Sequence, residues 1–286
     1  MNRVRLICLF VSLAGLLGAE TSIESAVALF EQKRYPEAAE AFLTIANADS
    51  QNARAHFYLG VLANKRGEND EAIRRLERAV ELDPENSEYH TELGGAYGDA
   101  AKDASALASL ALARKCAASL KRAVELDPDN LAARNGLITF YLAAPPIAGG
   151  GADKAYAQAE EIRKRDLVTG SAILGHLYLR DRKNQEAFAV YEAVLAVEPD
   201  NYQALYLLGR AASETGENLE RGEQALLRCL ELPPGPGEQG RAAVQWRLGV
   251  IAEKRGDIPA ARAAYTASLL SHPGFQQAAD SLARLK

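Results

Sequence analysis

The chain has 286 residues, of which 48% are hydrophobic and 25% are charged. This apolar fraction is enough to build a core, which excludes a disordered chain, and the three cysteines are too few for a small fold held by disulfides. The formal net charge of −5 argues against nucleic acid as a partner, because proteins bind phosphate polymers through basic surfaces.

Residues 1–19 have the pattern of a secretory signal peptide. Arg3 and Arg5 precede the apolar run Leu6–Gly18, which is too short to cross a bilayer as a helix. Ala19 is a small residue that suits cleavage by signal peptidase. We therefore expect cleavage after Ala19 and a periplasmic or secreted protein without a membrane span, whose 31 basic and 38 acidic residues give a net charge of −7.

A repeated pattern runs through the rest of the chain. The sequence Ala-Val-Glu-Leu-Asp-Pro occurs at Ala79–Pro84 and Ala123–Pro128, and a weaker copy ends at Pro199. Leu-Gly pairs begin at Leu59, Leu93, Leu174, Leu208 and Leu248. Small residues recur at intervals of 32 to 44 residues, at Ala38, Ala72, Cys116, Ala155, Ala187, Gly222 and Ala261. These features resemble the tetratricopeptide repeat (TPR) family, whose period is about 34 residues.

The resemblance implies an all-α fold, namely a right-handed superhelical solenoid of about seven helix–turn–helix repeats. With Ala53 as position 1 of the second repeat, small residues at positions 8 and 20 would let two helices approach closely, and a large residue at position 24 would fill the space between them. The expected repeats are residues 20–52, 53–86, 87–130, 131–167, 168–201, 202–234 and 242–275, followed by a capping helix at 276–286.

Prolines and asparagines mark the expected helix boundaries. Pro84, Pro128 and Pro199 cannot continue a helix, so each is expected to follow the end of one. Asn86, Asn130 and Asn201 are expected to cap the helices that come next. Pro36 and Pro259 fall in the first turn of a second helix, where the missing N–H costs nothing.

Cys116 and Cys229 fall at packing positions of this frame, three repeats apart. Neighbouring helices pack about 8–10 Å apart, whereas a disulfide needs Cα atoms within about 7 Å. We therefore predict two buried, free thiols.

Two insertions depart from the regular period. Ala104–Lys115 is expected to lengthen the second helix of the third repeat and to expose Leu107 and Leu110. Ala144–Gly151 is expected to form a loop that lays Ile147 against that helix. We predict that the two insertions pack together.

Catalytic and cofactor motifs are not found in the sequence, which predicts no enzymatic activity and no cofactor. His56 and His90 both occupy position 4, one repeat apart, but two histidines make an incomplete metal site. A small-ligand or metal-binding protein that uses these histidines or the Gly149–Gly151 loop stays an alternative.

The resemblance assigns certain positions of each first helix to a concave, partner-binding wall. The expected partner-binding residues are Phe57, Val61, Asn64, Asn135, His176, Arg180, Tyr206, Arg210 and Trp246. Aromatic residues and arginine are the usual energetic anchors of interfaces, so changing Tyr206, Arg210 and Trp246 to Ala is expected to cost binding and leave folding nearly intact. Two structural alternatives stay open. Trp246 could lie under the Pro233–Gly240 loop, and Phe57, Val61 and Asn64 could pack beneath the first repeat.

The sequence therefore predicts a non-catalytic scaffold of the cell envelope that binds a protein or peptide segment in a concave groove. A self-assembling structural homo-oligomer is the second alternative.

Overall fold

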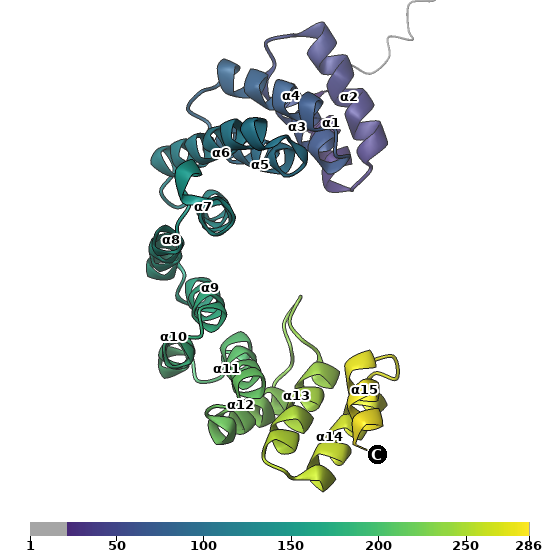
Figure 1. Cartoon of the computed structure of the whole chain (residues 1–286). Helices are drawn as coiled ribbons and strands as arrows, with labels where there is room; N and C mark the ends of the chain where they lie inside the picture. The colour runs from purple at the N-terminus through teal and green to yellow at the C-terminus, as the bar shows by residue number, and fades with distance from the viewer. Residues whose placement is uncertain (1–21, 286) are drawn as a thin grey trace, which may run out of the picture. The chain divides into compact units, whose positions relative to one another are not determined.

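A computed structural model describes residues 22–285 (Figure 1). These residues form fifteen α-helices and one short 3-10 helix, with no strand among them. The predicted signal peptide lies outside the described residues. The helices are α1 (Ile23–Glu31), α2 (Tyr35–Ala48), α3 (Ala53–Lys65), α4 (Asn69–Leu82), α5 (Ser87–Asp103), α6 (Ala106–Leu126), α7 (Leu131–Ala143), α8 (Ala152–Arg165), α9 (Leu167–Arg180), α10 (Asn184–Val197), α11 (Tyr202–Thr215), α12 (Leu219–Glu231), α13 (Arg241–Lys254), α14 (Ile258–Ser271) and α15 (Gln276–Arg284).

The chain divides into two compact units. Unit 1 ends at Pro128 and holds α1 to α6, and unit 2 begins at Asp129 and holds α7 to α15. Within each unit every helix packs against the next one along the chain, and first helices of neighbouring pairs also touch, namely α3 with α5, α9 with α11, and α11 with α13. The all-α class predicted from the sequence is confirmed. The handedness of the superhelix stays a prediction.

Side-chain caps begin most of the first helices. The Asn52, Asn86, Asn130 and Asn201 side chains each accept a backbone N–H from the first turn of α3, α5, α7 and α11, as predicted for the last three. Pro36 and Pro259 lie in the first turns of α2 and α14. Local sequence therefore sets where these helices start.

Glycine at position 8 brings the two helices of a pair close together. A Cβ added to Gly60 would lie 2.5 Å from Cγ of Leu76, and one added to Gly94 would lie 2.6 Å from Cγ of Leu120. Leu76 and Leu120 stand at position 24, so the predicted pairing of a small and a large residue is confirmed in α3 with α4 and in α5 with α6. Alanine at either position would force the facing leucine or its helix to shift.

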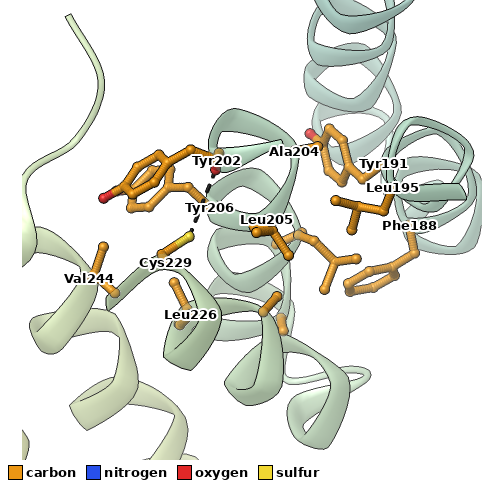
Figure 2. Close-up of a cluster of buried hydrophobic side chains, with 14 of the residues drawn as sticks. Phe188, Tyr191, Leu195, Tyr202, Ala204, Leu205, Tyr206, Leu226, Cys229 and Val244 are labelled. Carbon is orange, nitrogen blue, oxygen red and sulfur yellow. Dashed lines mark hydrogen bonds between the residues drawn. The ribbon is translucent and has the colours of Figure 1, made fainter. Parts of the chain in front are cut away.

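A core cluster of unit 2 spans α10 to α13 (Figure 2). Phe188 and Tyr191 of α10 face Leu205 of α11, while Leu226 and Cys229 of α12 lie beneath the same helix. Cys229 Sγ is 3.7 Å from the carbonyl oxygen of Tyr202. Side chains from four consecutive helices thus form one continuous apolar layer.

Both cysteines of the described chain are free and buried. Burial raises the pKa of the Cys116 thiol to about 11 and that of the Cys229 thiol to about 12. The predicted buried thiols are confirmed.

The first insertion lengthens two helices and not one. α5 continues to Asp103 and α6 starts at Ala106, so the extra residues are shared between both helices of the pair. Leu107 is 82% exposed at the start of α6. The sequence predicted an extension of the second helix only, because Ala and Leu favour a helix without indicating where its turn falls.

The second insertion forms a compact loop between α7 and α8. Pro146–Ala148 makes a single turn of 3-10 helix, and Gly149 and Gly151 then adopt φ angles of +96° and +150°, which side chains disfavour. The Gly151 N–H donates to the Tyr141 carbonyl at 2.8 Å. The two insertions belong to different units, so their mutual packing stays a prediction.

Candidate functional site on the inner helices

In unit 2 the first helices α7, α9 and α11 lie on one side of the stack, and α8, α10 and α12 lie on the other (Figure 1). Because α11 touches both α9 and α13, side chains of these three helices meet on one surface. We call this surface the unit 2 wall. The residues that matter for it are His176 and Arg180 on α9, Tyr206, Arg210, Ser213 and Glu214 on α11, and Trp246 and Arg247 on α13.

A buried arginine joins α13 to α11. Only 9% of Arg247 is exposed. Its Nε donates to the Tyr206 hydroxyl at 3.0 Å, its Nη1 to Ser213 Oγ at 2.8 Å, and its Nη2 to Glu214 Oε1 at 3.2 Å. The guanidinium also lies over the Trp246 ring, 4.9 Å from its centroid. The buried guanidinium thus has two hydroxyls and a carboxylate as hydrogen-bond partners. We call Tyr206, Arg210, Ser213, Glu214 and Arg247 the Arg247 network.

Arg210 connects this network to the solvent. Its Nε donates to the same Glu214 Oε1 at 2.8 Å, and 38% of its side chain is exposed. The Nη1 and Nη2 atoms of Arg210 have no hydrogen-bond partner among residues 22–285. Partial burial opposes the charged form of Arg210, but the hydrogen bond and charge of Glu214, with smaller contributions from Tyr206 and Tyr191, together outweigh it and raise the pKa of the guanidinium. The Nε of Arg210 is therefore fixed by Glu214, while Nη1 and Nη2 form an open edge of the guanidinium that can donate to a partner.

The neighbouring residues of α9 are exposed. Arg180 pairs with Asp181 at 2.8 Å, and the hydroxyl of Tyr156 donates to the other oxygen of Asp181 at 2.9 Å. The Arg180 hydrogen bond, with that from Tyr156, holds the pKa of Asp181 below its ordinary value. His176 is exposed and makes no polar contact within the described part of the chain.

Two of the predicted partner-binding residues, Tyr206 and Trp246, pack against other parts of the protein. Tyr206 is 9% exposed and belongs to the core cluster of unit 2. Trp246 is half-buried against the last helix, where its Nε1 donates to Ser281 Oγ of α15 at 3.2 Å and its ring lies 6.1 Å from that of Phe275. These contacts place Trp246 against α15, so the alternative in which the Pro233–Gly240 loop covers it gains no support. The expectation that Tyr206 and Trp246 can be truncated without loss of folding no longer holds.

Unit 1 carries the other predicted cluster on α3. Phe57 is 4% exposed and its ring stacks on that of Tyr89 of α5, with centroids 4.7 Å apart. Phe57 thus packs beneath the following repeat, not the first repeat as the structural alternative had it. Val61 and Asn64 are half-buried, and Asn64 Nδ2 donates to Asp99 Oδ2 at 3.1 Å. Asn135 lies on α7 of unit 2 and is exposed. Whether any of these residues binds a partner stays a prediction.

Acidic residues accompany this cluster on α5. Glu88, Glu92 and Asp99 are spaced by four and seven residues, which places them on one face of the helix. Glu92 is half-buried and has no ion-pair partner in residues 22–285. Burial, together with the charges of Glu88 and Asp99, raises the pKa of Glu92, and Lys65 only partly opposes this shift. We call the surface formed by α3 and α5 the unit 1 wall.

His56 lies beside a cavity of about 380 Å³ in unit 1, lined by Ser50, His56, Arg74, Glu77, Arg78 and Glu81. The ring nitrogen Nε2 is 3.3 Å from the Ser50 carbonyl oxygen, and Nδ1 is 3.3 Å from Arg75 Nη1. A carbonyl only accepts, so Nε2 carries the hydrogen and Nδ1 accepts from Arg75. Burial, together with the nearby arginines, lowers the pKa of His56. Both nitrogens are thus engaged by the protein.

His90 repeats part of this arrangement, since its Nε2 donates to the Pro84 carbonyl at 2.9 Å. Within residues 22–285, no three His, Cys, Asp or Glu side chains come together as a metal site requires. The Gly149 carbonyl of the glycine loop accepts from Lys154 Nζ at 2.8 Å. The metal and small-ligand alternative therefore gains no support from these groups. Likewise, no helix in the described chain combines the length and apolar character needed to cross a lipid bilayer.

Sequence reasoning missed Arg247, Ser213 and Glu214. Glu214 lies four residues after Arg210, a spacing that favours an ion pair on one helix and could have been noticed. Arg247 follows Trp246 directly, and nothing in its local sequence distinguishes a buried arginine from an exposed one.

Comparisons with known proteins agree with the fold. Residues 29–94 and residues 174–237 each match a sequence profile described as tetratricopeptide repeat, one in each unit. Among curated proteins, none matches the sequence significantly.

Solved structures resemble the chain at low sequence identity. The C-terminal part of a TPR repeat-containing protein from Cytophaga hutchinsonii is 18% identical with a TM-score of 0.61, over 91% of this chain and 99% of that one. A tetratricopeptide repeat protein from Parabacteroides merdae is 11% identical with a TM-score of 0.55, over 92% and 96%. The pilF protein of Pseudomonas aeruginosa is 16% identical with a TM-score of 0.51, over 81% and 97%.

At these identities the solved structures show a shared fold alone, while the two profile matches identify the repeats themselves. Together with the paired helices and their close-packed glycines, these matches identify tetratricopeptide repeats in both units of the chain.

Proposed function

We propose that the protein is a non-catalytic scaffold that binds a protein or peptide segment on the unit 2 wall. Members of this repeat family generally act as interaction scaffolds. The observation that carries the proposal is that Arg210, fixed by the Arg247 network, keeps two unused donors, while His176 and Arg180 are exposed on the neighbouring helix α9. Side chains that are fixed before binding lose little conformational entropy when a partner arrives.

We further propose that this binding takes place in the cell envelope. The support is the sequence of residues 1–19, in which two arginines, a short apolar run and a small residue follow in the order of a signal peptide. Fractionation of cells that produce the protein with a carboxyl-terminal tag, together with the mass of the mature chain, tests the location and the cleavage after Ala19.

Selection from a random peptide library displayed on phage tests the binding surface. The wall variant carries His176→Ala, Arg180→Ala and Arg210→Ala, which remove exposed groups and leave the buried Tyr206, Trp246 and Arg247 in place. The matched control carries Arg221→Ala and Arg228→Ala on α12, where both arginines are about as exposed as Arg210.

We expect the wild type and the control to enrich the same peptides and the wall variant to lose them. Thermal unfolding followed by circular dichroism verifies that both variants are folded. If the wall variant recovers the same peptides as the control, the unit 2 wall is not the binding surface and the proposal fails.

Self-association is the second candidate, favoured by one observation, the 82% exposure of Leu107 in unit 1. Multi-angle light scattering over a range of concentrations distinguishes the two candidates. A dimer that Leu107→Lys converts to a monomer would support self-association, and a concentration-independent monomer would remove it.

A further inference from the structure

The charges on the unit 2 wall define the chemistry of a partner more narrowly. We infer that this wall binds a peptide segment rich in aspartate or glutamate, and that the open edge of Arg210 receives a carboxylate of that segment. The inference rests on the proposed function, because it names the class of partner for the same surface.

The first step of the argument is the orientation of Arg210. Glu214 Oε1 accepts from Arg210 Nε at 2.8 Å, and this leaves Nη1 and Nη2 as a planar pair of donors without a partner in the described chain. A planar guanidinium edge matches the two oxygens of a carboxylate, and hydrogen bonds between two charged groups are about twice as strong as neutral ones.

The second step is the support behind Glu214. The same Oε1 accepts from Arg247 Nη2 at 3.2 Å, and Arg247 is in turn held by Tyr206 and Ser213. Glu214 therefore faces two arginines, so its single negative charge is already outweighed. The network presents a positive group to the solvent in a fixed orientation.

The third step is the charge of the surroundings. Arg180 and Lys254 are exposed on the same wall, and His176 stands on α9 without a polar partner in the described residues. Two further carboxylates on or beside these helices are already bonded, that of Asp181 to Arg180 and Tyr156, and that of Glu253 to the Tyr265 hydroxyl at 2.6 Å. The carboxylates of the unit 2 wall thus have partners of their own, whereas Arg210 keeps unused donors, which favours an acidic partner and disfavours a basic one.

The unit 1 wall has the opposite character. Glu88, Glu92 and Asp99 occupy one face of α5, and the raised pKa of Glu92 reflects burial and mutual repulsion on that face. An acidic segment would add to this repulsion. Binding of such a segment is thus expected at unit 2 and not at unit 1.

Fluorescence anisotropy of synthetic peptides tests the inference on the whole protein. One labelled peptide alternates Glu with Ala and is blocked at both ends, so that its side-chain carboxylates are its only charges. Two matched peptides carry Gln or Lys in place of Glu. We expect the Glu peptide to bind, the Gln peptide to bind more weakly, and the Lys peptide to bind weakest.

Three variants assign the effect to Arg210. Arg210→Gln is expected to weaken binding of the Glu peptide about tenfold. Arg228→Gln on α12, whose side chain is 42% exposed against 38% for Arg210, is expected to leave binding unchanged. Glu214→Gln keeps an oxygen acceptor for both arginines and removes a negative charge, so it is expected to tighten binding.

Two outcomes overturn the inference and are distinct from each other. In the first outcome, the Gln or Lys peptide binds best, and Arg210→Gln weakens binding of the Glu peptide no more than Arg228→Gln does. The partner is then not acidic, although the proposed function stands. If the wall variant binds every peptide as the wild type does, the proposed function fails as well. Circular dichroism of each variant separates a lost contact from a lost fold.

Discussion

The two units place opposite charges at the same position of the repeat. Position 6 of α5 is Glu92 in unit 1, and position 6 of α13 is Arg247 in unit 2. Both side chains are at least partly buried next to the preceding first helix, yet Glu92 has no ion-pair partner in residues 22–285 while Arg247 bonds to three side chains of α11.

The position in the repeat thus determines which side chains are buried. The neighbouring first helix determines whether a charge at such a position finds stabilising partners. α11 provides two hydroxyls and a carboxylate as hydrogen-bond acceptors for Arg247. The charged groups that shift the pKa of Glu92 are mainly other carboxylates. A buried charge needs such partners, because its transfer from water is otherwise costly. The unit 2 wall is therefore a rigid polar surface, and the unit 1 wall is an acidic surface under repulsion.

The largest expected loss of stability comes from truncating a buried leucine in the core of either unit. Leu76 in unit 1 and Leu226 in unit 2 are both fully buried, and each faces a position-8 glycine. We expect Leu76→Ala and Leu226→Ala each to cost about 2–5 kcal/mol of the free energy of unfolding. Urea denaturation followed by circular dichroism gives these values.

The two buried thiols report on each unit separately. Alkylation needs local opening, because Cys116 and Cys229 are 5% and 2% exposed. We expect Leu76→Ala to speed alkylation of Cys116 and Leu226→Ala to speed that of Cys229. Equal acceleration of both thiols by either variant would show that the two units open together.

The next effect concerns the Arg247 network. Arg247→Met keeps most of the volume but removes the bonds to Tyr206, Ser213 and Glu214, so we expect a loss of about 3 kcal/mol of the free energy of unfolding. The control Arg228→Met removes two exposed ion pairs, with Asp200 and Glu231, and should cost less than about 1 kcal/mol. An equal loss in both variants would mean that burial of Arg247 contributes nothing beyond a surface ion pair.

A smaller effect is expected from Tyr206→Phe, which removes the acceptor of Arg247 Nε and keeps the ring in the core. We expect a loss of about 1 kcal/mol in urea denaturation. Tyr191→Phe is the matched control, because Tyr191 is 2% exposed and its hydroxyl has no hydrogen-bond partner in the described chain. If the two variants lose the same free energy, the bond from Arg247 to Tyr206 is not stabilising.

The smallest effect is a gain of stability in unit 1. A glutamate whose pKa is raised by folding destabilises the folded state above that pKa, and this penalty disappears as the pH falls toward the ordinary value of glutamate. We expect Glu92→Gln to raise the melting temperature at neutral pH and to have no such effect below the ordinary pKa of glutamate. Groups facing Glu92 include Glu88, Lys65 and Asp99, so Glu88→Gln should produce part of the same gain. If Glu92→Gln instead lowers the melting temperature at neutral pH, the carboxylates on α5 do not destabilise the folded state by repulsion.

The sequence predicts the helices well because their boundaries depend on local chemistry. Asn86, Asn130 and Asn201 accept the backbone N–H groups that any helix start leaves free, and Pro84 follows the end of α4 because proline cannot continue a helix interior. Leu76 opposite Gly60 follows from the repeat frame alone. These features need only neighbours close in the chain or at a fixed repeat distance.

The candidate site was predictable only in part. Arg210 was identified by its position on the inner helix, and its partner Glu214 lies four residues away. Arg247 was not identified, because its burial depends on Tyr206, Ser213 and Glu214, which are 33 to 41 residues away on another helix. The orientation of α13 against α11 decides whether these atoms meet, and no pattern in the sequence specifies that angle. For the same reason the sequence did not indicate that Trp246 packs against α15.

Helix α15 decides where new repeats can be added to the protein. Its inner residues Ala278 and Ser281 are buried, whereas Gln276, Gln277 and Asp280 are exposed. A helix pair inserted between two existing pairs would find apolar neighbours on both sides, but one appended after α15 would meet glutamine and aspartate. Additional repeats that lengthen the binding surface should therefore be inserted upstream of α15. Removal of α15 would expose the apolar ring of Trp246 to solvent and favour aggregation.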